Sequence, residues 1–247
     1  MNILHLTDLH FSIDDENSRV ADKWKEIIAL AKNSNILRPV DVIAVTGDIT
    51  CHGLDIEFEQ AQIYLMMLMR ALSVKKESVL FCPGNHDADY EEAGSSFEHY
   101  ENFVKKIYAD SPPTDSLKHP FFAFHTINTC TQTSLIFYDQ AVIPEDIEVY
   151  LREIEKKDFG ILLMHHQPEV IKNQDALMEI VNSGKIKLIL CGHLHSTDVR
   201  CYSINNCQVV NGMAITPHLS WIPSGMQVVC ISTRGKVTVK SIKLSVK

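Results

Sequence analysis

The chain has 247 residues, 45% of them hydrophobic and 22% charged, which is typical of a globular protein that buries its core without disulfides. Its formal net charge of -8 counts against binding of duplex nucleic acid, which depends on lysine and arginine at phosphate groups. The seven cysteines are odd in number and several lie in apolar runs, which predicts buried, reduced thiols.

The sequence shows neither a signal peptide nor a segment able to span a membrane. Its start lacks a basic region, and the most apolar helix-like run, residues 63–72, is short and interrupted by Arg70. We therefore expect a cytoplasmic protein with no membrane partner. The oligomeric state is left open.

The first half of the chain alternates between strand-like and helix-like runs. Strands are expected at residues 2–6, 41–46 and 78–82, with helices at 19–32 and 56–72 between them. The second helix has apolar residues, including a methionine cluster, on every side, which predicts that it is well buried. This order of elements is typical of an α/β domain with parallel strands.

The pattern changes after the third strand. Residues 88–119 hold an acidic loop, a helix over 97–108 and a proline-containing break, which we interpret as a small insertion or cap within one domain spanning 1–247. Two later helices are expected at 145–156 and 175–182. The remaining expected strands are 121–124, 125–130, 134–138, 161–164, 187–191, 199–204, 207–211, 226–232 and 236–242. So many strands predict two packed sheets with helices outside. The segment 207–247 either completes the second sheet or presents an edge to a partner.

Five of the apolar runs end in Asp, Asn or His. These ends are "LTDLH", "VTGD", "CPGNHD", "LLMHH" and "LCGHLH". In open α/β sheets, sites form outside the carboxyl ends of the strands, so these side chains are expected to converge. Any one of them alone is better explained as a turn or hydrogen-bonded residue, but the repetition at five strand ends favours a site.

The chemistry of this set indicates transition metals. Carboxylates, imidazoles and an amide oxygen suit Mn, Fe, Zn or Ni better than a soft-metal site. Seven candidate ligands are too many for one tetrahedral ion but suit two ions about 3.5–4 Å apart that share a carboxylate. Asp48 is the natural bridge. The pairs Asp8/His10 and His193/His195 are expected to present alternate side chains on one side of extended backbone.

Together, these motifs resemble the calcineurin-like metallophosphoesterase superfamily. The resemblance implies a four-layer αββα sandwich of two mixed β-sheets flanked by helices, with two divalent or trivalent metal ions, Mn and Fe favoured. It implies one metal held by Asp8, His10, Asp48 and His195, and another held by Asp48, Asn85, His165 and His193. His86 matches the catalytic histidine of the family. Asp87 is expected to support the loop or orient His86.

The segments "GDITCHG", "PGNHD" and "HHQP" are most similar to class III cyclic-nucleotide phosphodiesterases. The resemblance implies a hydrolase that cleaves a small phosphodiester by a two-metal-activated hydroxide, with His86 donating to the leaving oxygen or stabilising it. Candidate substrate contacts are His52, His166 and Tyr90. The alternatives are a phosphomonoesterase or nuclease of the same superfamily and, in a different class, a metal-free protein-binding scaffold.

Aromatic residues of the 88–119 segment have two interpretations. Phe97, Tyr100 and Phe103 either line the site, where they would stack on a base, or pack in the core. Core packing is favoured for Phe97 and Phe103.

Overall fold

The computed structural model describes residues 1–13, 17–33, 35–37, 39–89, 96–108, 116–119, 121–130, 141–147, 152, 154, 159–217 and 221–245. Two mixed β-sheets form its centre. The five-stranded sheet has the order β11 (Val237–Lys243), β10 (Gly225–Ile231), β1 (Asn2–Leu6), β2 (Val42–Thr46) and β3 (Val79–Cys82). The six-stranded sheet has the order β4 (Ser116–His119), β5 (Phe122–Thr126), β6 (Phe159–Leu163), β7 (Ile186–Cys191), β9 (Cys207–Asn211) and β8 (Arg200–Ile204).

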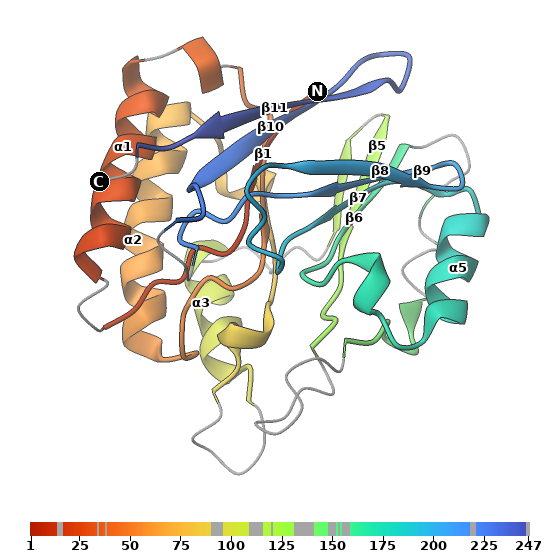
Figure 1. The fold of residues 1–247 in the computed structure, drawn as a ribbon, viewed down its shortest axis with the longest axis horizontal. Helices are drawn as coiled ribbons and strands as arrows, with labels where there is room; N and C mark the ends of the chain where they lie inside the picture. The colour runs from red at the N-terminus through yellow and green to blue at the C-terminus, as the bar shows by residue number, and fades with distance from the viewer. Residues whose placement is uncertain are drawn as a thin grey trace.

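Helices cover the two outer faces. Figure 1 shows α1 (Asn17–Asn33), α2 (Asp55–Leu72) and α3 (Glu98–Tyr108) on the side of the five-stranded sheet, and α5 (Gln174–Asn182) on the far side of the six-stranded sheet. Four short 3-10 helices connect these elements: η1 (Asn35–Leu37), η2 (Lys76–Ser78), η3 (Asn85–Asp87) and η4 (Pro168–Val170). The predicted four-layer αββα sandwich is confirmed.

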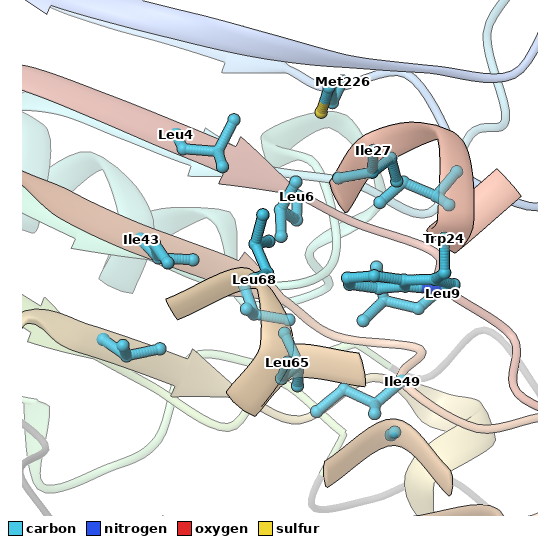
Figure 2. Packing of buried hydrophobic residues seen from close by; sticks show 14 of the residues in the cluster. Leu4, Leu6, Leu9, Trp24, Ile27, Ile43, Ile49, Leu65, Leu68 and Met226 are labelled. Atoms are coloured by element: carbon cyan, nitrogen blue, oxygen red, sulfur yellow. The ribbon is translucent and has the colours of Figure 1, made fainter. Parts of the chain in front are cut away.

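The core has three parts. Between the five-stranded sheet and its helices, Trp24 and Ile27 of α1 and Leu65 of α2 pack close to Leu4 and Leu6 of β1 (Figure 2). A second cluster packs α5 against the six-stranded sheet. The third lies between the sheets and is made of apolar side chains from both. Burial of these surfaces is the main force that holds the four layers together.

Parallel pairing explains where the site lies. β1, β2 and β3 pair in parallel, as do β5, β6, β7 and β9. Carboxyl ends of parallel strands lie at the same edge of a sheet, so the residues after β1, β2 and β3 meet at one edge and those after β6 and β7 at the corresponding edge of the other sheet.

The structure corrects the expectation for α2. Its buried residues Phe58, Ala61, Leu65, Leu68 and Leu72 follow helical spacing toward the sheet, but the other side is exposed. There Ile56, Ile63, Met66 and Met67 are 53%, 60%, 44% and 42% exposed. The prediction that this helix is well buried was therefore wrong for one face, because α2 lies in an outer layer with only one packed side.

The strands of the second half of the chain differ in part from those predicted. β4 was not predicted, and residues 127–130, expected to be strand, leave the sheet after Thr126. Residues 134–138 and most of 145–156 lie outside the described residues. Of the two alternatives for residues 207–247, completion of a sheet is seen: β9 joins the six-stranded sheet, while β10 and β11 complete the five-stranded one. That the segment presents an edge to a partner stays a prediction.

The structure also shows the burial of the cysteines and the length and polarity of the helices. All seven cysteines are free, but the prediction that they are buried holds only for four of them, Cys82, Cys130, Cys191 and Cys207. Cys51 and Cys230 are half-buried. Burial was wrong for Cys201, which is exposed because it lies on β8, the edge strand of its sheet. In the part of the chain that the structure describes, no helix is long and apolar enough to cross a lipid bilayer.

Candidate metal centre

Four of the predicted ligands form a first cluster, which we call the carboxylate cluster: Asp8, His10, Asp48 and His195. One ligand atom of each lies within 4.8 Å of the others. His195 Nε2 is 3.2 Å from Asp8 Oδ1 and 3.0 Å from His10 Nε2. All four residues are at most 9% exposed. The structure therefore brings together the set that the family resemblance assigned to one metal.

A second group, the imidazole cluster, consists of His165, His166 and His193, again with ligand atoms within 4.8 Å of one another. His193 Nδ1 lies 3.3 Å from His165 Nε2. His165 Nδ1 is 2.8 Å from the carbonyl oxygen of Thr46, to which it donates. This hydrogen bond fixes the tautomer and directs Nε2 into the site.

Asp48 connects the two clusters. Its Oδ2 lies 3.2 Å from His165 Nε2 and 3.8 Å from His10 Nε2. Its Oδ1 accepts a hydrogen bond from the backbone N–H of His86 at 2.9 Å. The carboxylate is therefore held by η3 on one side and faces histidines of both clusters on the other.

The backbone at the candidate ligands is left-handed rather than extended. Asp8, His10, Asp48, His193 and His195 have φ of 53°, 48°, 50°, 75° and 43°, values that residues other than glycine adopt uncommonly. The expectation of extended backbone at the Asp-x-His and His-x-His pairs was wrong. The chain curls after each strand, so the two histidines of 193–195 reach different clusters. Backbone strain of this kind gathers at functional sites.

Glycines allow the strand ends to approach closely. A Cβ on Gly84 would lie 2.1 Å from Asp48 Oδ1, and one on Gly192 would lie 1.8 Å from Thr7 Oγ1. No side chain fits at such distances. This explains why glycine stands directly before Asn85 and before His193 in the sequence.

The electrostatics of the site are those of buried carboxylates beside imidazoles. Burial alone would raise the pKa of the Asp48 carboxyl, but the charge of His165 and the hydrogen bond with it hold that pKa well below its usual range. Burial likewise opposes protonation of His165, yet Asp48 raises its pKa to about 9. Asp8 also has a lowered pKa, because the hydrogen bond with His195 and the charges nearby outweigh burial. Two buried carboxylates therefore stay ionised and require positive charge close by.

These residues fit a pair of metal ions. The donors are carboxylate oxygens and imidazole nitrogens, the ligands that borderline transition metals prefer. Two ring nitrogens, His10 Nε2 and His195 Nε2, face each other at 3.0 Å. The Nε2 of His166 is buried and has no hydrogen-bond partner among the residues that are placed. A cation near each cluster would satisfy all of these groups.

His86 and Asn85 lie on η3 beside the carboxylate cluster. The centroid of the His86 ring is 5.1 Å from that of His10, and its Nδ1 is 2.9 Å from the carbonyl oxygen of Cys51. Because a carbonyl can only accept, Nδ1 donates to it, and this bond orients the ring. Asn85 is 4% exposed and adjoins the N–H that binds Asp48. Its role as a metal ligand stays a prediction.

Asp87 supports the loops around the site. Its Oδ1 accepts from the backbone N–H groups of Ile49 and Thr50 at 2.8 and 3.0 Å, and its Oδ2 accepts from that of Gly84 at 2.8 Å. Burial, with the charge of Asp48 second, raises the pKa of this carboxyl to about 7. Of the two roles expected for Asp87, these bonds favour support of the loop, whereas the described bond that orients the His86 ring runs to Cys51.

The candidate substrate contacts differ in position. The His52 side chain is 53% exposed and its Nδ1 lies 2.9 Å from Oε1 of the buried Glu57. His166, in contrast, is fully buried in the imidazole cluster, and Tyr90 lies outside the described residues. Phe103 packs in the core against Phe58 at 5.2 Å between ring centroids, as favoured from the sequence.

Several supporting residues carry no recognisable signal in the sequence. Thr7 Oγ1 donates to Asp8 Oδ2 at 2.8 Å, and Thr129 Oγ1 lies 2.9 Å from His166 Nδ1. The Thr46 carbonyl accepts from both His165 and Thr7. Lone threonines in or after strands are common, so only the fold identifies these as partners of the site.

A comparison with protein families matches residues 1–197 to the model described as calcineurin-like phosphoesterase. The chain belongs to this family. The match includes every residue of both clusters, together with η3. Membership supports a hydrolase that acts on phosphoester bonds, and the candidate metal ligands of this chain are the His and Asp groups described above.

Individual relatives are distant. The chain is 23% identical over 252 residues to the "Probable cyclic nucleotide phosphodiesterase" of Xenorhabdus bovienii, covering 94% of this chain and 92% of that protein. It is 21% identical over 240 residues to the uncharacterized metallophosphoesterase-like protein YydB of Bacillus subtilis, covering 80% of this chain but 49% of YydB, about half of its length. The solved structure of an archaeal phosphodiesterase has a TM-score of 0.51 and 11% identity, covering 98% of this chain and all of that one, which shows the shared fold.

Proposed function

We propose that this protein is a dinuclear metal-dependent phosphodiesterase that hydrolyses a small phosphodiester, such as a cyclic nucleotide or a related compound. The observation that carries the two-metal part is the position of Asp48, whose Oδ2 faces His165 at 3.2 Å and His10 at 3.8 Å. A carboxylate between two ligand clusters is the arrangement that two-metal hydrolases use. The similarity to the Xenorhabdus protein along nearly the whole chain supports a diester substrate.

The residues would divide into two ligand sets that share Asp48. The carboxylate cluster would hold one ion through Asp8, His10, Asp48 and His195, and Asn85, His165 and His193 would hold the other with Asp48. When bound, two such ions lower the pKa of water and neutralise charge on phosphoryl oxygens, and manganese or iron are the favoured metals.

The protein's own groups would complete the reaction. His86, held by the Cys51 carbonyl, would donate from Nε2 to the leaving oxygen as the bond to phosphorus breaks. Asp87 would keep η3 in place through its bonds to backbone N–H groups on both adjoining loops. Because Asp48 also binds the N–H of His86, a single carboxylate sets the distance between the proton donor and the metals.

The test compares hydrolysis of bis-p-nitrophenyl phosphate and p-nitrophenyl phosphate by protein stripped with chelator and reloaded with Mn²⁺. We expect faster cleavage of the diester, and no cleavage without metal. Faster cleavage of the monoester would contradict the diester preference and favour a phosphatase. No cleavage of either substrate by protein that holds two ions would contradict the proposed activity on simple diesters, and absence of bound metal would favour a scaffold.

A further inference from the structure

One histidine of the imidazole cluster lies outside the ligand set proposed above. His166 follows His165 directly and is fully buried. Its ring centroid lies 4.6 Å from that of His193 and 5.0 Å from that of His165. The three rings are therefore in mutual contact, and their ligand atoms all lie within 4.8 Å of one another.

The two nitrogens of His166 have different surroundings. Nδ1 lies 2.9 Å from the hydroxyl oxygen of Thr129, a residue that is itself fully buried. Nε2 is buried with no hydrogen-bond partner in the described parts of the chain. A buried polar atom without a partner destabilises the folded protein, so such an atom is normally satisfied by a group bound beside it.

The Thr129 hydroxyl can decide which nitrogen carries the proton. If it accepts from Nδ1–H, the ring is neutral and its buried Nε2 carries the lone pair, in a ring that lies against those of His165 and His193. Histidines that bind metals are held in this way, with one nitrogen on the metal and the other hydrogen-bonded to an oxygen. The arrangement around His165, whose Nδ1 meets the Thr46 carbonyl, is the same.

We propose that His166 is an additional imidazole ligand at the second metal position, beside His165 and His193, and that Thr129 orients it. The inference rests on the proposed two-metal site and adds a ligand to it. It replaces the expectation, drawn from the sequence, that His166 contacts substrate. It also makes the second position richer in nitrogen than the first, which favours Co²⁺, Ni²⁺ or Zn²⁺ over Mn²⁺ there.

The test is titration of chelator-stripped protein with Co²⁺, followed by calorimetry and by the visible absorbance of the bound ion. We expect two ions per chain for the unaltered protein. His166→Phe keeps an aromatic ring in the cluster but removes the nitrogen. The affinity for the ion in the imidazole cluster should fall by about tenfold or more, while the affinity for the ion in the carboxylate cluster stays unchanged. The loss should be larger for Co²⁺ than for Mn²⁺, because imidazole is the better ligand for Co²⁺.

Two further variants keep the test decisive. Thr129→Val retains the imidazole and removes only its oxygen partner. The affinity for the ion in the imidazole cluster should fall by about tenfold, and the cobalt absorbance should shift. This variant tests the inference even if His166→Phe does not fold. His125→Phe is the matched control: His125 is 3% exposed on β5, in register with residues that pack toward α5, and this change should leave both ions in place.

The outcomes separate this inference from the proposed function. Two ions bound with unchanged affinity by His166→Phe and Thr129→Val would overturn the inference and leave the two-metal site intact. A loss of turnover in His166→Phe with both ions retained would instead support a substrate contact and also overturn it. If the unaltered protein binds no Co²⁺, the proposed two-metal function itself fails.

Discussion

The two ligand clusters differ in charge and in origin. The carboxylate cluster draws Asp8, His10 and Asp48 from the five-stranded sheet and His195 from the other sheet, whereas all three histidines of the imidazole cluster follow strands of the six-stranded sheet. The first cluster therefore contains its own negative charge. The second contains none, and the carboxylate oxygen beside its ring nitrogens is Oδ2 of Asp48, which lies 3.2 Å from His165 Nε2. If each cluster holds an ion as proposed, the two positions would share Asp48, and their affinity for cations would depend on it.

The largest effect is expected from Asp48→Asn, which removes the shared charge. Both ions should be lost from protein dialysed against a low metal concentration, and turnover should fall more than about 100-fold, since even changes to residues behind the ligands cost 10–100-fold. Metal content by mass spectrometry and hydrolysis of bis-p-nitrophenyl phosphate measure the two effects. Asp41→Asn, at an aspartate hydrogen-bonded to the backbone of Asn2 far from both clusters, is the control. If Asp48→Asn kept two ions, the clusters would not share this residue.

His86→Ala should separate catalysis from metal binding. Both ions should stay, because His86 is outside the proposed ligand set and its Nδ1 is hydrogen-bonded to the Cys51 carbonyl. Turnover should fall by about 10²–10⁴, the usual contribution of a proton donor. The loss of turnover should be smaller for a substrate with a nitrophenyl leaving group than for one with an alkyl leaving group. An alkoxide is the stronger base, so its departure depends more on a proton donor. An equal loss for both leaving groups, or a loss of metal, would contradict the assigned role.

Gly84→Ala should disturb both clusters through Asp48 without removing a ligand. The new Cβ would stand 2.1 Å from Asp48 Oδ1 and 2.3 Å from its backbone nitrogen, so the carboxylate must move. We expect a loss of affinity for both ions of about 10–100-fold, measured by calorimetric titration with Mn²⁺. Gly235→Ala is the control: its φ of 75° makes any side chain there strained, but the nearest neighbour of the new Cβ is 3.4 Å away, so no ligand is displaced. Unchanged affinity in Gly84→Ala would show that Asp48 adapts freely.

The smallest effect concerns the layer beneath both clusters and depends on pH. His5 is fully buried, its Nε2 lies 2.8 Å from Thr46 Oγ1, and burial lowers its pKa to about 3. Above pH 6.5, His5 is neutral whether the chain is folded or not. Below pH 6.5, His5 is protonated in the unfolded chain but stays neutral in the folded chain. The free energy of unfolding therefore falls by up to about 1.4 kcal/mol per pH unit toward pH 3.

His5→Asn removes this slope. Urea denaturation of metal-free protein should show the variant less stable at pH 8, by about 1 kcal/mol for the altered hydrogen bond. Between pH 6 and 4.5 the difference should shift by about 2 kcal/mol in favour of the variant. Parallel curves for the two proteins over this range would contradict the assignment of a neutral, buried His5.

The strands and the edge at which the candidate ligands meet could be predicted from the sequence, but the backbone conformation at the ligands could not. Apolar runs ending in Asp, Asn or His gave the strands and their shared edge, because β pairing and strand direction follow from local patterns. The left-handed backbone of Asp8 and His193 could not be read in this way, since glycine-poor segments such as "TDLH" normally predict extended chain.

Contacts that join distant segments were also beyond the sequence. Thr129 and His166 are 37 positions apart in the sequence. Thr129 follows β5 and His166 follows β6, and the pairing of these two strands brings the residues together. The exposed face of α2 was missed for a related reason. A helix that is apolar all round looks buried in a sequence, and only its place in an outer layer leaves Ile63 and Met66 in contact with solvent.

The most direct test of two ion positions around Asp48 is anomalous diffraction from crystals of the protein loaded with Co²⁺, recorded at the cobalt absorption edge. The account predicts two peaks per chain about 3.5–4 Å apart, one beside Asp8, His10 and His195 and the other beside His165 and His193, with the Asp48 carboxylate between them. A single peak in the carboxylate cluster, with density for water alone among the histidines of the other, would contradict it.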